Sequence, residues 1–200
     1  HSGHNSNVAR NILVKSYMQK ANNGKVLELG SQLWIRWINQ FDISPKEIDC
    51  INISKKELQY GIDYSKNTTV KPCFKIMDAH ELQYDDEIFD VVFGGGILHH
   101  LNFEEAINEI CRVLKKDGIA IFVEPLDLNI IGKLVRLCTP NQRTLDETPL
   151  KSRHLNYLKL NTKSKFYYEQ LLSVPFGVIS GLIFNSPENI ITKFAFAIDN

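Results

Sequence analysis

The sequence of 200 residues lacks several features that define whole classes of protein. It has no excess charge, because 23 lysines and arginines balance 23 aspartates and glutamates, which argues against nucleic acid as a partner. No apolar run reaches the roughly 18 residues that a membrane-spanning helix requires. The composition therefore predicts a globular protein with no membrane span, long enough for one domain with a sizeable core.

Cysteine is also scarce: the chain has four, and none forms a Cys-x-x-Cys pair. Cys50 and Cys73 lie within apolar runs, so we expect buried free thiols rather than disulfides or a zinc site. His99 and His100 have no further ligands at metal-binding spacing, so no metal is expected. Reduced thiols are typical of a cytoplasmic protein, and this is the location that we predict.

What the sequence does contain is a regular alternation of apolar and amphipathic segments up to residue 124. The run 25–29 places Glu28 near its end and is followed by Gly30, which is typical of a buried strand that stops at a tight turn. Further strands are predicted over 48–53, 73–77, 89–93 and 119–123, with helices over 7–20, 32–40, 54–60 (ended by Gly61) and 103–114. We expect Ser54 and Glu57 to form a capping box, and Asn102 to cap the last of these helices. This order predicts an α/β fold with a doubly wound, mostly parallel Rossmann-like sheet and helices on both faces.

After residue 124 the alternation fades. Prolines surround a helical patch over 130–137, a late strand is predicted over 165–172, and Ser-Pro-Glu at 186–188 predicts a helix over 187–198. We expect residues 1–200 to form a single domain.

Five segments in this order resemble the class I S-adenosylmethionine-dependent methyltransferases of the small-molecule branch. The resemblance rests on the first motif (26–30), the end of the second strand (51–54), the acidic residue after the third strand (77–79), the fourth motif (89–101) and the run into the fifth strand (112–118). It implies that S-adenosyl-L-methionine is the cofactor and that 126–150 is a lid-like insert, with 151–200 completing the substrate side.

The resemblance also assigns cofactor-binding positions. Glu28 would meet the methionine part, and Asp78 with the Ala79 amide would meet the adenine. The full set of predicted cofactor-binding residues is Glu28, Gly30, Ser31, Asn52, Ile53, Asp78, Ala79, Gly94 and Gly95. Three of these assignments have plainer alternatives: a solvated acid at a strand end for Glu28, a helix cap for Asp78, and a flexible turn for Gly94 and Gly95.

Two departures from the family pattern stand out. The family's first loop reads Gly-x-Gly-x-Gly, whereas here only Gly30 remains, so Gln32 and Trp34 must point away from the ligand or the loop must be wider. Asn52 stands where an acid usually holds the ribose diol. An amide offers both a donor and an acceptor there, without charge assistance.

For catalysis, His99 and His100 are the candidate general bases, because imidazole titrates near neutral pH. The same histidines could instead be a structural element of the fold. The predicted function is methyl transfer to oxygen, nitrogen or carbon of a small-molecule substrate. The alternatives are a non-catalytic cofactor-binding module and, with less support, a nicotinamide-dependent oxidoreductase, which would need further glycines after the first strand. The sequence does not specify the acceptor or the oligomeric state.

Overall fold

The computed structural model describes residues 4–66, 68, 70–126 and 149–168. Contacts divide the chain into two compact units, of which one comprises Val14–Pro125 and Thr148–Leu150 and contains the sheet. The sequence expectations over 130–137 and 187–198, most of the lid-like segment 126–150, and part of the strand over 165–172 lie outside the described residues. The division into two units leaves the single-domain expectation a prediction.

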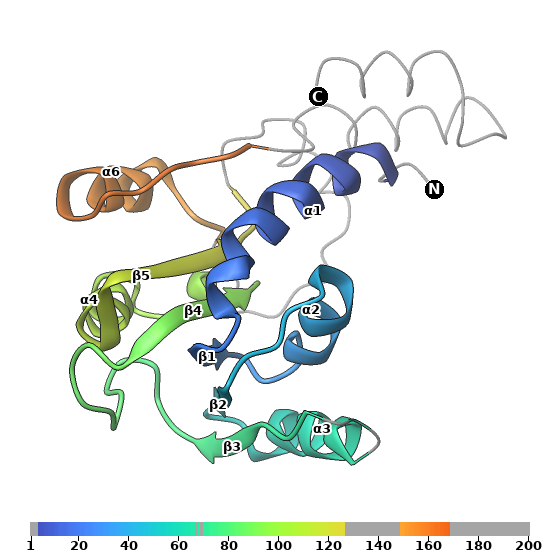
Figure 1. Ribbon diagram of the computed structural model, residues 1–200. Helices are drawn as coiled ribbons and strands as arrows, with labels where there is room; N and C mark the ends of the chain where they lie inside the picture. The colour runs from blue at the N-terminus through green and yellow to red at the C-terminus, as the bar shows by residue number, and fades with distance from the viewer. Residues whose placement is uncertain (1–3, 67, 69, 127–148, 169–200) are drawn as a thin grey trace, which may run out of the picture. The chain divides into compact units, whose positions relative to one another are not determined.

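The sheet has five strands, all parallel, in the order β3-β2-β1-β4-β5 (Figure 1). They are β1 (Lys25–Leu29), β2 (Glu47–Asn52), β3 (Cys73–Ile76), β4 (Phe89–Gly95) and β5 (Leu114–Val123). From β1 the chain builds outward through β2 to β3, then returns to the other side of β1 as β4. The order therefore reverses between β1 and β4, and in such sheets ligands bind at the carboxyl ends beside this reversal.

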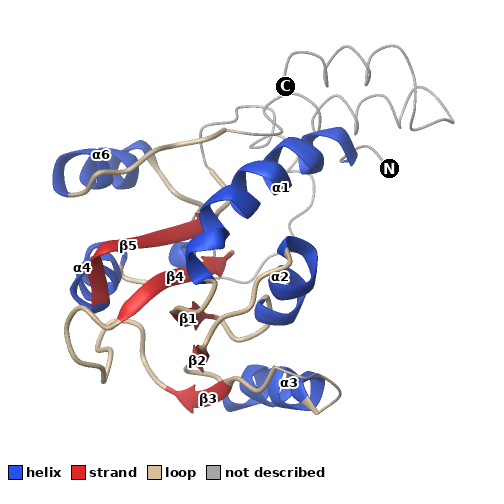
Figure 2. Ribbon diagram, viewed as in Figure 1, coloured by secondary structure: helices blue, strands red, loops and turns tan. Residues whose placement is uncertain are grey.

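Helices cover both faces of the sheet, as predicted: α2 and α3 lie on one face and α4 lies on the other (Figure 2). The bounds are α1 (His4–Met18), η1 (Gln19–Ala21), α2 (Trp34–Phe41), α3 (Lys55–Ser65), η2 (Leu98–His100), α4 (Phe103–Val113) and α6 (Ser152–Asn161). Helix α6 was not predicted from the sequence. It belongs to the second unit, buries only Leu155 among its residues, and begins where the Lys151 N–H donates to Nδ1 of His154 at 3.2 Å.

The core explains why these segments form these elements. β1 and β2 are buried almost throughout, as expected for strands covered on both faces. On the α2 face, Trp37 stacks on Phe93 with ring centroids 4.8 Å apart and meets Phe41 edge-on at 5.7 Å. On the opposite face, α4 buries Phe103, Ala106, Ile107 and Ile110 of the apolar stripe predicted from the sequence. Val113 completes the buried face in place of Cys111, which was predicted to belong to it and is exposed.

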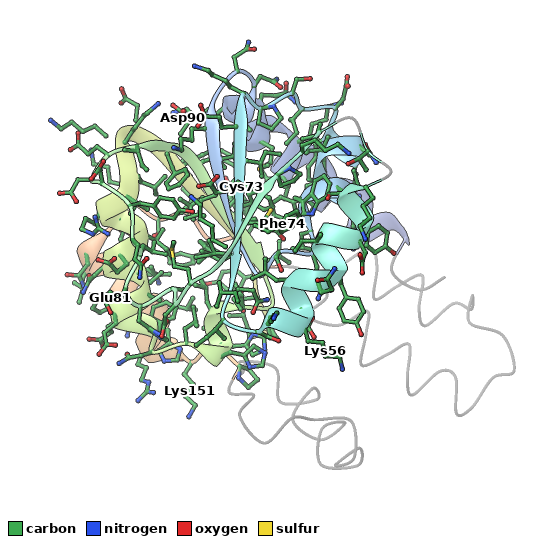
Figure 3. The ribbon with its side chains drawn as sticks, turned by 90° about the horizontal axis from the view of Figure 1, so that it is seen from below. Lys56, Cys73, Phe74, Glu81, Asp90 and Lys151 are labelled. Atoms are coloured by element: carbon green, nitrogen blue, oxygen red, sulfur yellow. The ribbon has the colours of Figure 1, made fainter. Side chains whose placement is uncertain are left out.

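Gly61 corrects one sequence expectation, because it lies inside α3 rather than beyond its end. A Cβ at this position would be 2.5 Å from the Ser31 carbonyl oxygen and 2.7 Å from Cε1 of Phe74. Phe74 of β3 lies beside α3 (Figure 3). The glycine therefore lets the helix approach the loop after β1 closely, and it does not terminate the helix.

The helix caps are also simpler than predicted. The Ser54 hydroxyl accepts the Glu57 N–H at 3.3 Å, but the Ser54 N–H donates to Asn52 Oδ1 at 2.9 Å, so the reciprocal half of the box is missing. Asn102 makes no side-chain cap, and its backbone N–H donates to Nε2 of His80 at 2.8 Å. The Ser54 N–H is thus taken by a local partner two residues earlier, and the Asn102 N–H by a tertiary partner.

Three further expectations need correction. β5 begins at Leu114 rather than at 119, with a register irregularity opposite Phe89–Val91 that requires Gly118, where a Cβ would be 2.9 Å from the Lys115 carbonyl oxygen. Cys50 is buried as predicted, but Cys73 is exposed, because β3 is the edge strand. Residues 165–168 form no strand.

Candidate functional site

The predicted site residues of the sheet unit gather at the carboxyl ends of its strands. The loop after β1 carries two residues with left-handed backbone, Gly30 (φ 111°) and Ser31 (φ 65°). A Cβ built on Gly30 would meet nothing within 4 Å, so the space in front of this residue is open. A glycine with positive φ facing open space permits close approach of a ligand to the backbone.

Glu28 is fully buried, so it is not the solvated acid that the plainer alternative supposed. Its Oε1 accepts the N–H of Leu33 at 2.5 Å, and its Oε2 accepts the N–H of Trp34 at 3.2 Å. These are the first free amides of α2, where a carboxylate also faces the positive end of the helix dipole. Glu28 therefore fixes the loop of Gly30 and Ser31 from its inner side.

Burial disfavours the ionised form of the Glu28 side chain. It raises the pKa of Glu28 from 4.5 to about 7, although the amides of Leu33 and Trp34 and the Cys50 thiol oppose the rise. The Cys50 Sγ lies 3.3 Å from Oε2, and burial together with this carboxylate raises the pKa of the thiol well above its usual value. Cys50 is consequently an inert thiol that donates to Glu28.

The two departures from the family pattern both have structural explanations. Trp34 is buried and meets Phe74 edge-on at 6.3 Å, while the Gln32 amide donates to the Glu57 carboxylate, so both point away from the front of the loop. The Asn52 amide donates to the Gly30 carbonyl oxygen at 3.0 Å, which a carboxylate could not do. Asparagine in place of an acid thus adds a second hydrogen-bonded contact that holds the loop, besides those of Glu28.

The same region offers an apolar surface and an unpaired hydroxyl. Ile53 and Ile76, at the ends of the adjacent strands β2 and β3, are 71% and 62% exposed. Ser31 Oγ is buried without a hydrogen-bond partner among the described residues. Buried hydroxyls are normally paired, so this one indicates a missing partner beside Gly30. Ile76 was not among the residues singled out from the sequence.

Asp78 lies in the loop after β3, and Ala79 beside it is buried. Its Oδ1 accepts the backbone N–H of His80 at 2.9 Å and lies 2.6 Å from the Nδ1 of the same histidine. The His80 N–H and ring lower the pKa of Asp78, so the carboxylate is ionised near neutral pH. Oδ2 has no partner within the described part of the chain. Asp78 caps no helix, which removes its plainer alternative.

Arg112 holds this loop against α4. Its five N–H groups reach the two oxygens of Glu109, the carbonyls of Leu82 and Tyr84, and the carboxylate of Asp86, all at 2.7–2.9 Å. These partners raise the pKa of Arg112 further above its usual value, with Glu109 contributing most. The arginine therefore positions the segment that carries Asp78.

Gly94 and Gly95 lie at the end of β4, next to β1. A Cβ on Gly94 would be 2.9 Å from Cγ2 of Ile97 and 3.0 Å from the Leu29 carbonyl oxygen, and one on Gly95 would be 2.7 Å from Cδ1 of Leu33. The backbone oxygen of Leu29 therefore disfavours a side chain at Gly94, whereas the Leu33 side chain at Gly95 could move aside. Their contact with a cofactor remains a prediction.

His99 and His100 lie in η2, immediately after β4, with ring centroids 4.0 Å apart. His99 Nδ1 is 2.8 Å from Oε2 of Glu124, which follows β5, and the side chains are only 7% and 5% exposed. The other oxygen, Oε1, accepts the N–H groups of Ile97 and Leu98 at 2.9 and 3.0 Å. Sequence reasoning missed Glu124, because its partner is 25 residues away.

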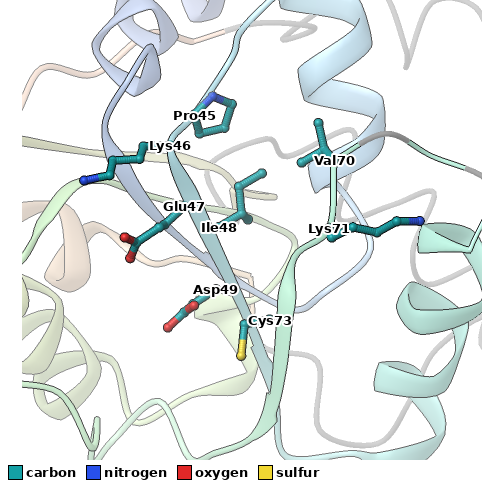
Figure 4. A pocket seen from close by; sticks show the side chains of 8 residues that line it. All are labelled: Pro45, Lys46, Glu47, Ile48, Asp49, Val70, Lys71 and Cys73. Carbon is teal, nitrogen blue, oxygen red and sulfur yellow. The ribbon is translucent and has the colours of Figure 1, made fainter.

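A hollow of about 500 Å³ lies at the opposite edge of the sheet, where β2 and β3 begin (Figure 4). It is lined by Pro45, Lys46, Glu47, Ile48, Asp49, Val70, Lys71 and Cys73. None of the cofactor-binding or catalytic residues predicted from the sequence borders it. Its position at the amino ends of the strands sets it apart from the edge where open α/β sheets bind ligands.

No helix in the described part of the chain has the length and apolar character needed to cross a membrane. No group of three or more histidine, cysteine, aspartate or glutamate side chains is arranged to hold a metal ion in that part of the chain.

Comparisons with known proteins agree with this geometry. Residues 27–122 match the family model described as "Methyltransferase domain". No curated protein matches the sequence.

Solved structures resemble the fold at low sequence identity. A candidate methyltransferase from Bacillus halodurans C-125 superposes with a TM-score of 0.62 at 20% identity, covering 78% of this chain and 68% of its own. The YcgJ protein of Bacillus subtilis gives 0.59 at 19%, covering 85% and 68%. A candidate sarcosine dimethylglycine methyltransferase from Galdieria sulphuraria gives 0.60 at 17%, covering 98% and 76%.

At these identities the structural likeness establishes the fold, whereas the family match identifies the sequence signature within it. The match spans β1 to β5, which includes the loop of Gly30, the Asp78 loop and His99. Residues 27–122 therefore match a methyltransferase domain by their sequence signature, and the fold is the one seen in these solved structures.

Proposed function

We propose that this protein binds S-adenosyl-L-methionine at the carboxyl ends of β1 to β4 and transfers its methyl group to a small-molecule acceptor. The observation that carries the proposal is the open space in front of Gly30, beside the buried Ser31 Oγ, which has no hydrogen-bond partner in the described part of the chain. A ligand with backbone-directed polar atoms would fill this space and supply the missing partner.

The remaining polar groups fit the cofactor in order along the edge. The ionised Asp78 has its Oδ2 available to accept from the adenine amino group, and exposed Ile53 and Ile76 offer apolar contact to the ring. Asn52 uses one amide hydrogen and one acceptor contact within the protein, which leaves a donor and a lone pair for the ribose. Glu28 would act on the methionine part through the loop that it fixes.

When bound, the cofactor supplies an electrophilic methyl carbon on a sulfonium. The protein then has to align the acceptor, exclude water and manage the acceptor's proton. The zero net charge is compatible with a small neutral or weakly charged acceptor. The Galdieria relative carries a small amine in its name, which supports an acceptor of metabolite size in general and specifies no substrate here.

Calorimetric titration tests the proposal directly. We expect S-adenosylmethionine to bind and NAD not to bind, whereas the reverse would favour the oxidoreductase. Asp78→Asn keeps the shape and the acceptor for His80 but presents an amide to the adenine, so affinity should fall at least about tenfold. Asp85→Asn, an exposed change in the same loop, is the matched control and should bind normally.

Failure of both ligands to bind would overturn the proposal. Binding of S-adenosylmethionine with no transfer of labelled methyl to any component of a small-molecule extract would instead favour the non-catalytic module. Equal affinities of the Asp78→Asn and Asp85→Asn variants would remove Asp78 from the site.

A further inference from the structure

We infer that His99 is the general base of the transfer reaction, that Glu124 positions it, and that the acceptor atom is therefore a hydroxyl oxygen. This inference rests on the proposed function and adds the acceptor class and the roles of the two side chains. It begins from the buried contact between them, at 2.8 Å.

The contact determines which ring nitrogen of His99 carries the proton. An ionised carboxylate can only accept hydrogen bonds, and Oε1 of Glu124 already accepts from two backbone N–H groups, of Ile97 and Leu98. Nδ1 of His99 must then be the donor to Oε2. In the neutral imidazole this leaves Nε2 without a proton, as a base requires.

The position of His99 suits this role. It follows the carboxyl end of β4, and Gly30 follows the carboxyl end of the adjacent strand β1. Both residues therefore lie at the edge of the sheet where the methyl donor is proposed to bind. Nε2 has no hydrogen-bond partner among the described residues and is not one of the fully buried unpaired atoms, so it retains access to the surface. His100 is exposed, and no carboxylate in the described part of the chain orients its ring.

The presence of a positioned general base indicates which class of acceptor the site accommodates. A protonated amine can lose its proton to water before it binds, whereas an alkoxide is scarcely populated at neutral pH. A hydroxyl acceptor must therefore give up its proton as it attacks. In the balanced step, Nε2 of His99 takes the hydroxyl proton, the oxygen forms its bond to the methyl carbon, and the bond between that carbon and sulfur breaks with its electron pair remaining on sulfur. Glu124 stabilises the resulting imidazolium, and the proton then leaves to solvent.

The variant Glu124→Gln separates positioning from structure. Its side-chain oxygen can still accept the N–H groups of Ile97 and Leu98, but its amide would donate to Nδ1 and move the imidazole proton to Nε2. His99→Asn is the complementary change, because its amide nitrogen can still donate to Glu124 while no base remains. Glu104→Gln, exposed on α4, is the matched control.

Two readouts decide the matter. Nitrogen-15 NMR of the ring at pH 8 should show an unprotonated Nε2 in the wild type and a protonated Nε2 in Glu124→Gln. Labelled methyl transfer to a small-molecule extract should yield methyl ethers. In both variants kcat should fall at least about 100-fold, with the dissociation constant of S-adenosylmethionine within about twofold of the wild type.

Several results would overturn the inference while leaving the proposed function intact. These are a protonated Nε2 in the wild type, methyl products on nitrogen or carbon, or variants that retain kcat. If Glu124→Gln does not fold, His99→Asn alone decides. A wild type that binds cofactor but methylates nothing overturns the inference too, whereas a wild type that binds no cofactor overturns the proposed function.

Discussion

Replacing Glu28 by glutamine tests the central physical feature of the site, a buried carboxylate that fixes the first loop. The folded pKa of about 7 lies above the unfolded value of 4.5, so the folded state holds the proton more tightly. The contribution of Glu28 to stability is therefore fully present below pH 4.5 and is lost as the pH rises through about 7. Glu28→Gln cannot titrate, and its stability should lack this dependence.

The magnitude follows from the pKa difference. At about 1.4 kcal/mol per pH unit, a rise from 4.5 to about 7 corresponds to about 3 kcal/mol. The stability of the wild type minus that of Glu28→Gln should therefore fall by about 3 kcal/mol between pH 4.5 and pH 8. Taking the difference between the two proteins cancels the titration of every other group.

The assay is urea unfolding followed by tryptophan fluorescence. The only two tryptophans, Trp34 and Trp37, lie in α2, so the signal reports on the element that Glu28 caps. Glu109→Gln is the matched control, because Arg112 lowers the pKa of Glu109, and its difference from the wild type should be flat between pH 5 and pH 8. A difference for Glu28→Gln that is constant with pH, or that rises, would refute the reasoning.

Three other substitutions test the contacts that hold the loops around the proposed site. Gly61→Ala would normally stabilise a helix, but here the new Cβ would clash with the Ser31 carbonyl, so the free energy of unfolding measured in urea should fall by about 1–3 kcal/mol. A rise in this free energy would contradict the close approach. Arg112→Met removes five hydrogen bonds, so hydrogen exchange of the backbone amides over 80–86, measured by mass spectrometry, should accelerate about tenfold. Unchanged protection would show that contacts other than those of Arg112 hold the loop. Asn52→Asp places a carboxylate against the Gly30 carbonyl and should lower the free energy of unfolding by about 1 kcal/mol at pH 8. Tighter S-adenosylmethionine binding without loss of stability would instead mean that the contact to the ribose dominates.

The sequence alone determined the order of elements along the chain and the edge of the sheet at which the site is proposed. Strands buried on both faces read as continuous apolar runs, and α4 shows its apolar stripe, because these patterns depend on local periodicity. The loop at Gly30, the acid at Asp78 and the histidines after β4 were predicted from the sequence and lie at the carboxyl ends of β1, β3 and β4, on one edge of the sheet. The parallel direction of the strands followed from the same alternation, whereas their order in the sheet did not.

Only the tertiary structure decided how the polar groups are used. Glu28 faces inward because α2 begins with free amides beneath the loop, and Asn52 turns to the Gly30 carbonyl rather than to solvent alone. Gly61 looked like a helix end because its partner, the Ser31 backbone, is 30 positions away in the sequence, and only packing brings the two together. Glu124 meets His99 for the same reason: neighbouring strands place residues 25 apart at one edge, and no local pattern records which strands are neighbours.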